Sequence, residues 1–243
     1  MNHLHFILQG KGGVGKSMAA VLLTQYLQSK GNSVICADTD PVNHTFAKYK
    51  SLDVARVEIA DNGKILTAKF DPLMETIVNT EADFVIDNGA ATFLPLSQYL
   101  KENDIYEVMS QAGKKVFVHS VLTGGAGQAD TYSGLALLLD NVDQHAKVVI
   151  WENEFWGKVN FDGHPITASK LYKEAQKAGK IAGVVKIEDR SQSDTMVGDI
   201  KAMTTNSMTL SDVMESDKFN FLAKNRLKKV IGAVFEELDK VSW

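Results

Sequence analysis

The stretch GKGGVGKS, Gly10–Ser17, decides the fold of this 243-residue chain. It fits the phosphate-loop pattern G-x-x-x-x-G-K-[ST]. The apolar run Leu4–Gln9 ahead of it predicts a strand, and helically spaced apolar residues over 17–28 predict a helix behind it. Gly31 lies where a glycine ends such a helix. A strand, a glycine-rich loop and a helix in this order predict a nucleotide phosphate site.

The residues of this loop suit phosphate for separate reasons. Glycines let the backbone fold tightly, so that successive N–H groups point at phosphate oxygens, and the helix adds the positive end of its dipole. Lys16 would bring a full charge to the β- and γ-phosphates, and the Ser17 hydroxyl suits Mg²⁺. The predicted binding set is Gly12, Gly13, Val14, Gly15, Lys16, Ser17 and Met18. Lys11, at the front of the loop, is left without a role.

Further strands are predicted where short apolar runs are rich in β-branched residues. They lie at 33–38, 83–87, 115–122, 147–151 and 181–187. Helical patterns separate most of them, at 94–110, 129–139 and 169–178. This alternation predicts one α/β domain over residues 1–243, a mostly parallel twisted sheet with helices on both faces, as in a P-loop NTPase.

Three local signals refine this prediction. Asn62-Gly63 between two β-rich pieces predicts a hairpin. Asp71 and Pro72 predict a helix start, with Asp71 as N-cap and Pro72 as the first helical residue. The polar stretch 189–207 predicts a long loop with a short helix.

Carboxylates at two predicted strand ends could hold a metal and orient a water molecule, which a phosphate loop needs for hydrolysis. Asp87 follows three apolar residues in FVIDNG, the Walker B pattern. Asp38 and Asp40 lie in ADTDP at the end of another strand. Asp38 could instead cap its strand, and Asp40 could be a turn residue. The candidate Mg²⁺ ligands are Ser17, Asp40 and Asp87.

Composition excludes several other classes. A net charge of −4 gives no overall basic field for nucleic acid. The single cysteine, Cys36, excludes an intrachain disulfide, a CxxC site and an iron–sulfur cluster held by this chain's own cysteines. No apolar run reaches about 18 residues, and the first ten residues lack the features of a signal peptide, so we expect a cytoplasmic protein.

The motifs KGGVGKS, ADTDP and FVIDNG together resemble those of the deviant Walker A ATPases of the ParA/MinD family. The resemblance implies that two subunits sandwich two ATP molecules, and that Lys11 crosses the interface to touch the partner's nucleotide. It implies catalytic roles for Lys11, Lys16 and Asp40, with Asp40 positioning the attacking water. Asn153 matches an asparagine that contacts adenine, although a simple turn asparagine is an equal alternative.

Within that family, several segments are similar to TraL/StbB-type proteins of conjugative plasmids, among them VIDNGAATFLPLSQYL and the ending LAKNRLKKVIGAVFEELDKV. The resemblance implies an ATP-dependent homodimer that acts with an unidentified partner, such as the conjugation or partition machinery. The sequence departs from partition ATPases at Asn88-Gly89, where prolines are usual, and at Val42, where glutamine is usual.

Two alternatives stay open. The chain could be a nucleotide-dependent adaptor with negligible ATPase activity. It could also be a MinD-like membrane-associated positioning ATPase, because an apolar stripe at helical spacing runs through 227–238. A final helix packed on the sheet is the favoured interpretation of that stripe. Direct DNA binding is left open.

Overall fold

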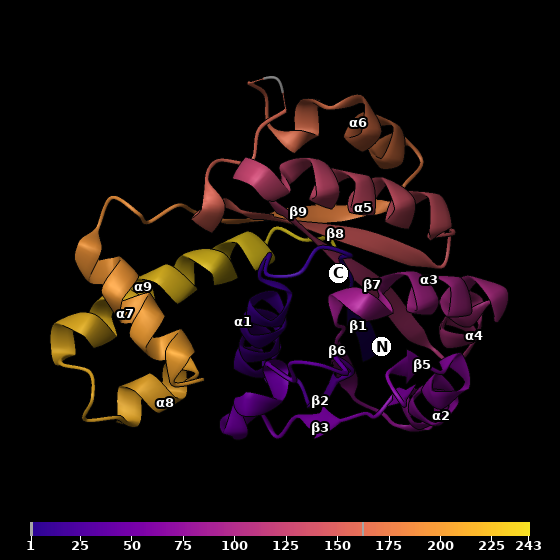
Figure 1. Ribbon diagram of the computed structural model, residues 1–243, viewed down its shortest axis with the longest axis horizontal. Coiled ribbons are helices and arrows are strands. Elements are labelled where there is room, and N and C mark those ends of the chain that lie inside the picture. The colour runs from indigo at the N-terminus through magenta and orange to yellow at the C-terminus, as the bar shows by residue number, and fades with distance from the viewer. Residues whose placement is uncertain (1, 162) are drawn as a thin grey trace.

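A seven-stranded parallel sheet forms the centre of the computed structural model, which describes residues 2–161 and 163–243 (Figure 1). The strand order is β3-β2-β6-β1-β7-β8-β9. The strands are β1 (Asn2–Ile7), β2 (Val34–Asp38), β3 (Ala55–Arg56), β6 (Asp83–Asp87), β7 (Lys114–Thr123), β8 (Ala146–Asn153) and β9 (Ile181–Ile187). Central strands such as β6 are buried along their whole length, which explains their continuous apolar runs.

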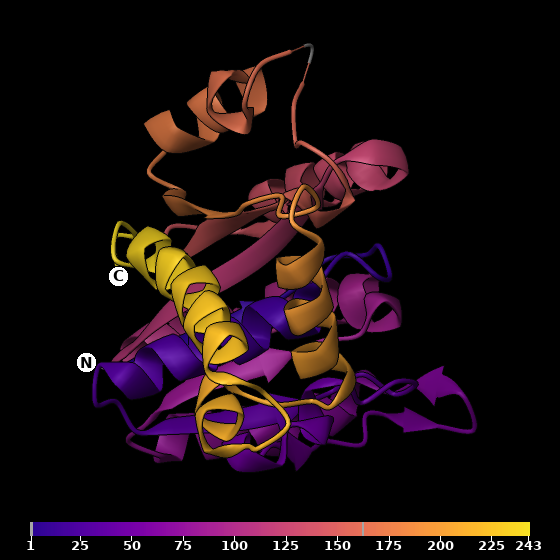
Figure 2. The same ribbon diagram turned by 90° about the vertical axis from the view of Figure 1, so that its left-hand side faces the viewer.

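Helices cover both faces of the sheet, so each face has its own apolar core. One face carries α2 (Asp71–Asn79), α3 (Phe93–Glu102), α4 (Ile105–Gln111), α5 (Gln128–Asn141) and α6 (Lys170–Lys177). The other face carries α1 (Lys16–Ser29), α7 (Asp194–Thr205), α8 (Leu210–Glu215) and α9 (Phe221–Leu238), with α9 lying across α1 (Figure 2). The predicted α/β class and the parallel sheet are confirmed.

The register of the sheet brings the predicted motifs to one edge. Asp38 of β2 pairs with Asp87 of β6, and Ile7 of β1 pairs with Asp87 from the other side. Because all three strands are parallel, their carboxyl ends meet at the same edge. The phosphate loop therefore leaves the sheet directly beside the two aspartates.

Several local predictions are confirmed and three are wrong. The hairpin at Asn62-Gly63 forms from β4 (Ala60–Asp61) and β5 (Lys64–Ile65), and Gly31 follows α1 with φ 84°. The predicted helix over 94–110 is two helices, because Asp104 takes a left-handed conformation with φ 48° between α3 and α4.

The start of α2 and the stretch 189–207 also differ from expectation. Asp71 is the first helical residue rather than the N-cap, and Pro72 is the second. The Asp71 carboxylate does not cap the helix but accepts a hydrogen bond from Tyr99 Oη at 2.7 Å. The stretch 189–207 is mostly the helix α7, because the Ser193 side chain caps its amino end through Met196 N. The Tyr99 partner of Asp71 lies 28 residues away and leaves no local pattern, whereas Ser193 is a local N-cap signal that the prediction did not use.

The last helix, α9, packs on the core, as the favoured interpretation of its sequence predicts. Its apolar stripe is buried against α1 and the sheet, through Leu227, Ile231, Val234 and Leu238. Leu222 on the opposite face of the helix is 50% exposed. The stripe is therefore part of the core, and this structure gives no support to its use as a membrane anchor.

This packing predicts different effects of one substitution at two positions of α9. Leu227→Ala removes a side chain that is 1% exposed and should lower the free energy of unfolding by about 2–5 kcal/mol. Leu222→Ala removes the same atoms from a half-exposed side chain and should cost less, at most about 1 kcal/mol. Urea unfolding of both variants measures the difference. Equal, small losses would show that the stripe is not core.

Candidate nucleotide-binding site

The phosphate loop leaves the carboxyl end of β1 and turns into α1. Gly13 and Gly15 have φ angles of 76° and 102°, which glycine adopts without strain. Val14 is buried and Met18 packs against the same core, so both anchor the loop to the α1 face of the sheet. A Cβ at Gly12 would meet nothing within 4 Å, so the front of the loop is open.

Lys16 lies inside the loop, facing carboxylates. Its buried Nζ donates a hydrogen bond to the Lys11 carbonyl oxygen at 3.0 Å. Burial lowers the pKa of Lys16, while the charges of Asp87 and Asp40 act in the opposite direction. The ammonium group is therefore held at the centre of the loop, beside the ends of β2 and β6.

Asp87 is a buried carboxylate with one oxygen left over. Burial raises the pKa of Asp87 to about 7, and a hydrogen bond from the Ser17 hydroxyl partly offsets this effect. Within the described chain, Asp87 Oδ1 has no hydrogen-bond partner. An unpaired buried carboxylate oxygen is costly, and here it lies beside a serine hydroxyl. This donor set fits Mg²⁺, which takes oxygen ligands.

Asp38 and Asp40 shape the loop that follows β2. Asp38 accepts hydrogen bonds from Asp40 N at 2.9 Å and from Ala47 N at 3.0 Å, so both its oxygens bind backbone. Asp40 Oδ1 accepts from Val42 N at 2.9 Å. A Cβ on Gly89 would lie 2.7 Å from the Asp40 carboxyl carbon, so glycine makes room for Asp40 over the Walker B loop. Asp38 thus has the strand-end capping role, and the other Asp40 oxygen, Oδ2, accepts a hydrogen bond from Asn43 Nδ2 at 3.3 Å.

Asn88, which follows Asp87 directly, is buried and fully hydrogen-bonded. Its Nδ2 donates to the Ile7 and Ile86 carbonyl oxygens at 3.2 and 3.1 Å, and its Oδ1 accepts from Thr39 Oγ1 at 2.7 Å. This buried amide therefore ties together the ends of β1, β6 and β2 around the site.

Asn153 lies at the carboxyl end of β8, on the far side of the loop. Its Nδ2 donates to the Val14 carbonyl oxygen at 2.8 Å, and its Oδ1 accepts from Phe155 N at 3.2 Å. A Cβ on Gly15 would lie only 2.6 Å from Asn153 Nδ2. Asn153 therefore braces the phosphate loop and caps the turn after its strand. A contact with adenine stays a prediction.

Lys11 points out of its own loop. Its Nζ lies 2.8 Å from Asp130 Oδ2, in the first turn of α5. Beside this pair lies a groove of about 670 Å³ between α3 and α5, whose walls include Phe93, Leu94 and Leu137. The second lysine of the motif therefore faces an apolar groove rather than the site that Lys16 occupies.

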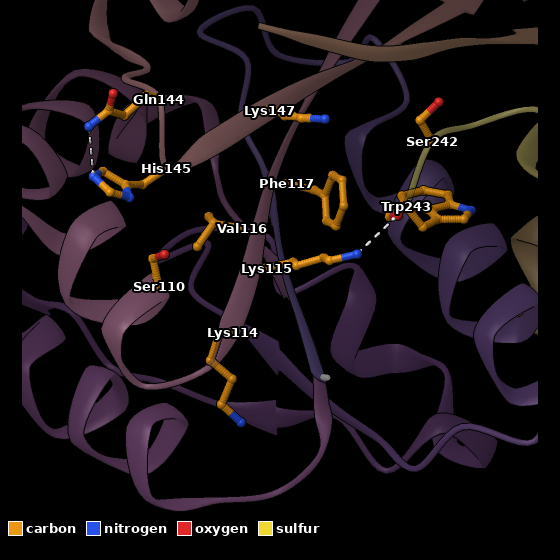
Figure 3. Close-up of a pocket in the computed structure, with 10 residues that line it drawn as sticks. All are labelled: Ser110, Lys114, Lys115, Val116, Phe117, Gln144, His145, Lys147, Ser242 and Trp243. Atoms are coloured by element: carbon orange, nitrogen blue, oxygen red, sulfur yellow. Dashed lines mark hydrogen bonds between the residues drawn. The ribbon is translucent and has the colours of Figure 1, made fainter. Parts of the chain in front are cut away.

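A second hollow, of about 230 Å³, lies at the opposite end of the sheet (Figure 3). It opens at the amino ends of β7 and β8, and Lys115 Nζ there donates to the Trp243 carbonyl oxygen at 3.2 Å. The parallel register separates it from the phosphate loop, so it takes no part in the nucleotide site.

The described residues offer neither a cluster of metal ligands nor a membrane-spanning helix. Among the described residues, no three or more His, Cys, Asp and Glu side chains are grouped so that they could hold a metal ion. A metal at this site would therefore depend on Ser17, Asp87 and oxygens brought by the nucleotide. Over the same residues, no helix is long and apolar enough to cross a membrane.

Two residues of this site were missed in the sequence. Gln9 precedes the loop and is buried, with its side chain bonded to the loop and to α5. Asp130 pairs with Lys11 across 119 positions of sequence. The buried polar residue directly before a phosphate loop was a usable signal for Gln9, but no local pattern marks Asp130.

The sequence of this chain matches known proteins over nearly its whole length. A family model for the CobQ/CobB/MinD/ParA nucleotide binding domain matches residues 5–239. Two Escherichia coli proteins named TraL are 38% identical over 239 residues and 36% identical over 242 residues. These alignments cover 98% and 100% of this chain, and 98% and 99% of the relatives.

Solved structures agree on the fold. MinD cell division protein of Aquifex aeolicus superposes with a TM-score of 0.52 at 15% identity, covering 99% of this chain and 98% of that chain. The MinC:MinD complex from the same organism gives a TM-score of 0.53 at 14% identity, covering 99% of this chain and 97% of that chain. At such identities the likeness shows the fold alone. The family match over nearly the whole chain, together with the phosphate loop and its facing aspartate, shows that this chain belongs to the CobQ/CobB/MinD/ParA nucleotide-binding domain family.

Proposed function

We propose that this chain is an ATP-binding molecular switch, built as one domain over residues 1–243, that forms an ATP-sandwich homodimer and hydrolyses ATP slowly. The observation that carries the proposal is that the two lysines of the phosphate loop point to different places. Lys16 Nζ lies inside the loop, while Lys11 contributes only its carbonyl oxygen there and sends its ammonium group outward. A lysine that leaves its own phosphate site is available for a nucleotide held by another subunit.

The surface around Lys11 also supports a dimer. Leu94 at the start of α3 is 63% exposed, and Val42 in the loop after β2 is 74% exposed. Val42 and the start of α3 follow the carboxyl ends of β2 and β6, at the nucleotide edge of the sheet, and Leu94 lines the groove beside Lys11. Together with the apolar lining of that groove, Leu94 forms part of a contiguous apolar patch, and such patches are typical of contact surfaces. We propose that the partner subunit covers this edge when ATP is bound.

The proposed roles follow from the positions of the side chains. Lys16 and the loop amides would hold the phosphates, and Ser17 and Asp87 would hold Mg²⁺, with Asp40 as a further candidate ligand. The bound ion would neutralise phosphate charge during transfer. Asp40 would orient the attacking water, since its carboxylate lies near Lys16 and over Gly89. Asn153 is proposed to contact adenine once its hydrogen bond to the Val14 carbonyl oxygen is broken.

The process served is proposed from the full-length similarity to proteins named TraL. We propose a role in conjugative transfer, partition or positioning of a plasmid, in the cytoplasm, with a protein partner still to be identified. Val42, Asn88 and Gly89 depart from the partition pattern, which supports a partner different from that of partition ATPases. An adaptor with negligible turnover is the second candidate, and the hydrolysis measurement below separates the two.

The first prediction concerns the nucleotide and its metal. Lys16→Ala should weaken ATP binding by at least about 100-fold, because charge-assisted contacts to two phosphates are lost. Asp87→Asn keeps the size of the side chain but removes its charge, so added Mg²⁺ should no longer strengthen ATP binding. Isothermal titration with and without EDTA measures both effects. Near-normal Mg-ATP affinity in Lys16→Ala would refute the assigned phosphate site.

The second prediction concerns turnover. Asp40→Asn keeps an oxygen that can accept from Val42 N, so the loop should stay folded and ATP should still bind. Hydrolysis should fall about 10²- to 10⁴-fold, because the water loses its orienting carboxylate. Phosphate release is measured beside Asp61→Asn, an exposed aspartate of the hairpin. Wild-type turnover in Asp40→Asn would assign the water to another residue, and undetectable turnover in the wild type would favour the adaptor.

The third prediction concerns Lys11. Lys11→Ala should leave the ATP affinity of the monomer nearly unchanged, since Lys16 and the loop amides remain. The ATP-bound dimer should weaken about 10²- to 10⁴-fold, because two charge-assisted contacts of roughly 1.5–3 kcal/mol each are lost. Sedimentation of Asp40→Asn with and without Lys11→Ala measures the dimer. If the double variant dimerises as tightly as Asp40→Asn alone, Lys11 does not cross the interface.

A further inference from the structure

The loop that carries Asp40 is shaped mainly by bonds within itself. Among the described residues, Asp40 makes hydrogen bonds only to Asp38, Val42 and Asn43, which lie two or three residues away from it in the sequence. These bonds fold the loop, but they do not hold it against β6. Another contact must therefore fix where the Asp40 carboxylate lies relative to Asp87.

Thr39, the residue directly before Asp40, makes that contact. Its N donates to the Asp87 carbonyl oxygen at 2.9 Å, which continues the pairing of β2 with β6 one residue past Asp38. Its hydroxyl has one proton to donate and lies 2.7 Å from Asn88 Oδ1, against 3.2 Å from the Asp87 carbonyl oxygen, so the amide is the closer acceptor. The two side chains belong to residues that are 0% and 1% exposed, so water does not compete for this bond.

The Asn88 amide is fixed in one orientation. Its Nδ2 donates to the Ile7 and Ile86 carbonyl oxygens at 3.2 and 3.1 Å. A carbonyl oxygen can only accept, so the amide nitrogen must lie on that side and the amide oxygen must face Thr39. Ile7 is the last residue of β1, the strand that leads into the phosphate loop. The amide therefore joins the strand of the phosphate loop to the residue before Asp40.

The next residue, Gly89, lies in close contact with Asp40. A Cβ at position 89 would lie 2.7 Å from both Cγ and Oδ1 of Asp40, and 3.1 Å from its Cα. Asp40 thus occupies the space that any side chain at position 89 would need. Because Asn88 and Gly89 are neighbours, the bond to Thr39 and this contact together set the position of the Asp40 carboxylate beside the end of β6.

We infer that Asn88 is a positioning residue for Asp40, and that it acts through the hydroxyl of Thr39. The inference rests on the proposed function, in which Asp40 orients the attacking water. Misplacing a reacting group by about 1 Å can lower a rate by about 100-fold. Lys16 and the amides of the phosphate loop do not depend on this bond. Its loss should therefore lower turnover and spare ATP binding.

The main experiment compares Thr39→Val with Thr39→Ser. Valine has nearly the shape of threonine without the hydroxyl, whereas serine keeps the hydroxyl. Turnover is measured at saturating Mg-ATP and divided by the number of sites that titrate with ATP, so that unfolded protein does not count. Thr39→Val should lower kcat by about 10- to 100-fold and leave the ATP affinity within about threefold of wild type. Thr39→Ser should keep most of the turnover. A wild-type kcat in Thr39→Val would overturn the inference.

Thr24→Val is the matched control for the loss of a buried hydroxyl. Thr24 is also 0% exposed, but its Oγ1 lies 3.5 Å from Cys36 Sγ, between α1 and β2 and away from the Asp40 loop. Urea unfolding shows how much stability each valine costs, and Thr24→Val should leave kcat unchanged. If Thr24→Val lowers kcat as far as Thr39→Val does, the loss is a general structural effect and the positioning role is overturned.

A double variant tests whether the two side chains act as one unit. Asn88→Ala should lower kcat at least as far as Thr39→Val, and adding Thr39→Val to it should change kcat little further, because the hydroxyl has already lost its partner. Losses that multiply in full would show independent effects and overturn the link. Asn88→Ala also leaves two buried carbonyl oxygens without their donor, and if it does not fold, the comparison of Thr39→Val with Thr39→Ser decides alone.

A third measurement does not need turnover. The aspartate carboxyl carbons are labelled with ¹³C, and the Asp40 signal is assigned by its absence in Asp40→Asn. Asn88→Ala should shift the Asp40 signal, whereas Asn103→Ala, which removes an amide bonded to the Tyr99 carbonyl oxygen at the end of α3, should not. An unmoved Asp40 signal in Asn88→Ala would overturn the positioning role. A wild type that does not hydrolyse ATP but shows this shift would contradict the proposed turnover and still leave Asn88 as the residue that places Asp40.

Discussion

The rest of the site depends on the burial of one carboxylate, that of Asp87. It lies at the end of a fully buried strand, and its Oδ1 has no hydrogen-bond partner among the described residues. Burying a charge is costly unless a cation or hydrogen bonds offset the loss of water. Lys16 supplies part of that offset from across the loop. The remaining unpaired oxygen explains why a bound cation would stabilise this arrangement.

Side-chain amides hold the surrounding loops in place. Asn88 ties three strand ends together, Asn153 braces the phosphate loop at Val14, and Gln9 joins that loop to α5. Two glycines leave room for two of these amides: Gly15 lies against the Asn153 side chain, and Gly134 lies against the Gln9 side chain. An amide can donate and accept at once, so each bridges loops that have no regular hydrogen-bond ladder. The phosphate loop is thus supported from both sides by side chains of the chain itself.

The two lysines of the loop differ in environment more than in sequence. Lys16 is buried and bonded to loop backbone, whereas Lys11 is half-exposed and paired with α5. A buried lysine suits a fixed site, because its position is set by packing and it has few rotamers. An exposed lysine on a weak ion pair can change partners at little cost. The phosphate loop of this chain therefore carries a buried lysine and a half-exposed lysine five residues apart.

The sequence by itself determined the fold class, the parallel sheet, the phosphate loop and the strand-end positions of Asp38, Asp40 and Asp87. These features follow from local periodicity and from glycine and lysine spacing, which act over a few residues. Tertiary structure alone decided the brace from Asn153 and the pairing of Lys11 with Asp130, because these partners are distant in sequence and meet only when parallel strands bring their ends to one edge. The turn at Asp104 and the Ser193 cap of α7 are local features that the periodicity of apolar residues does not show. Local pattern therefore determines which residues can bind a phosphate. Packing decides that the Lys16 side chain is buried in the loop and that the Lys11 side chain lies at the surface.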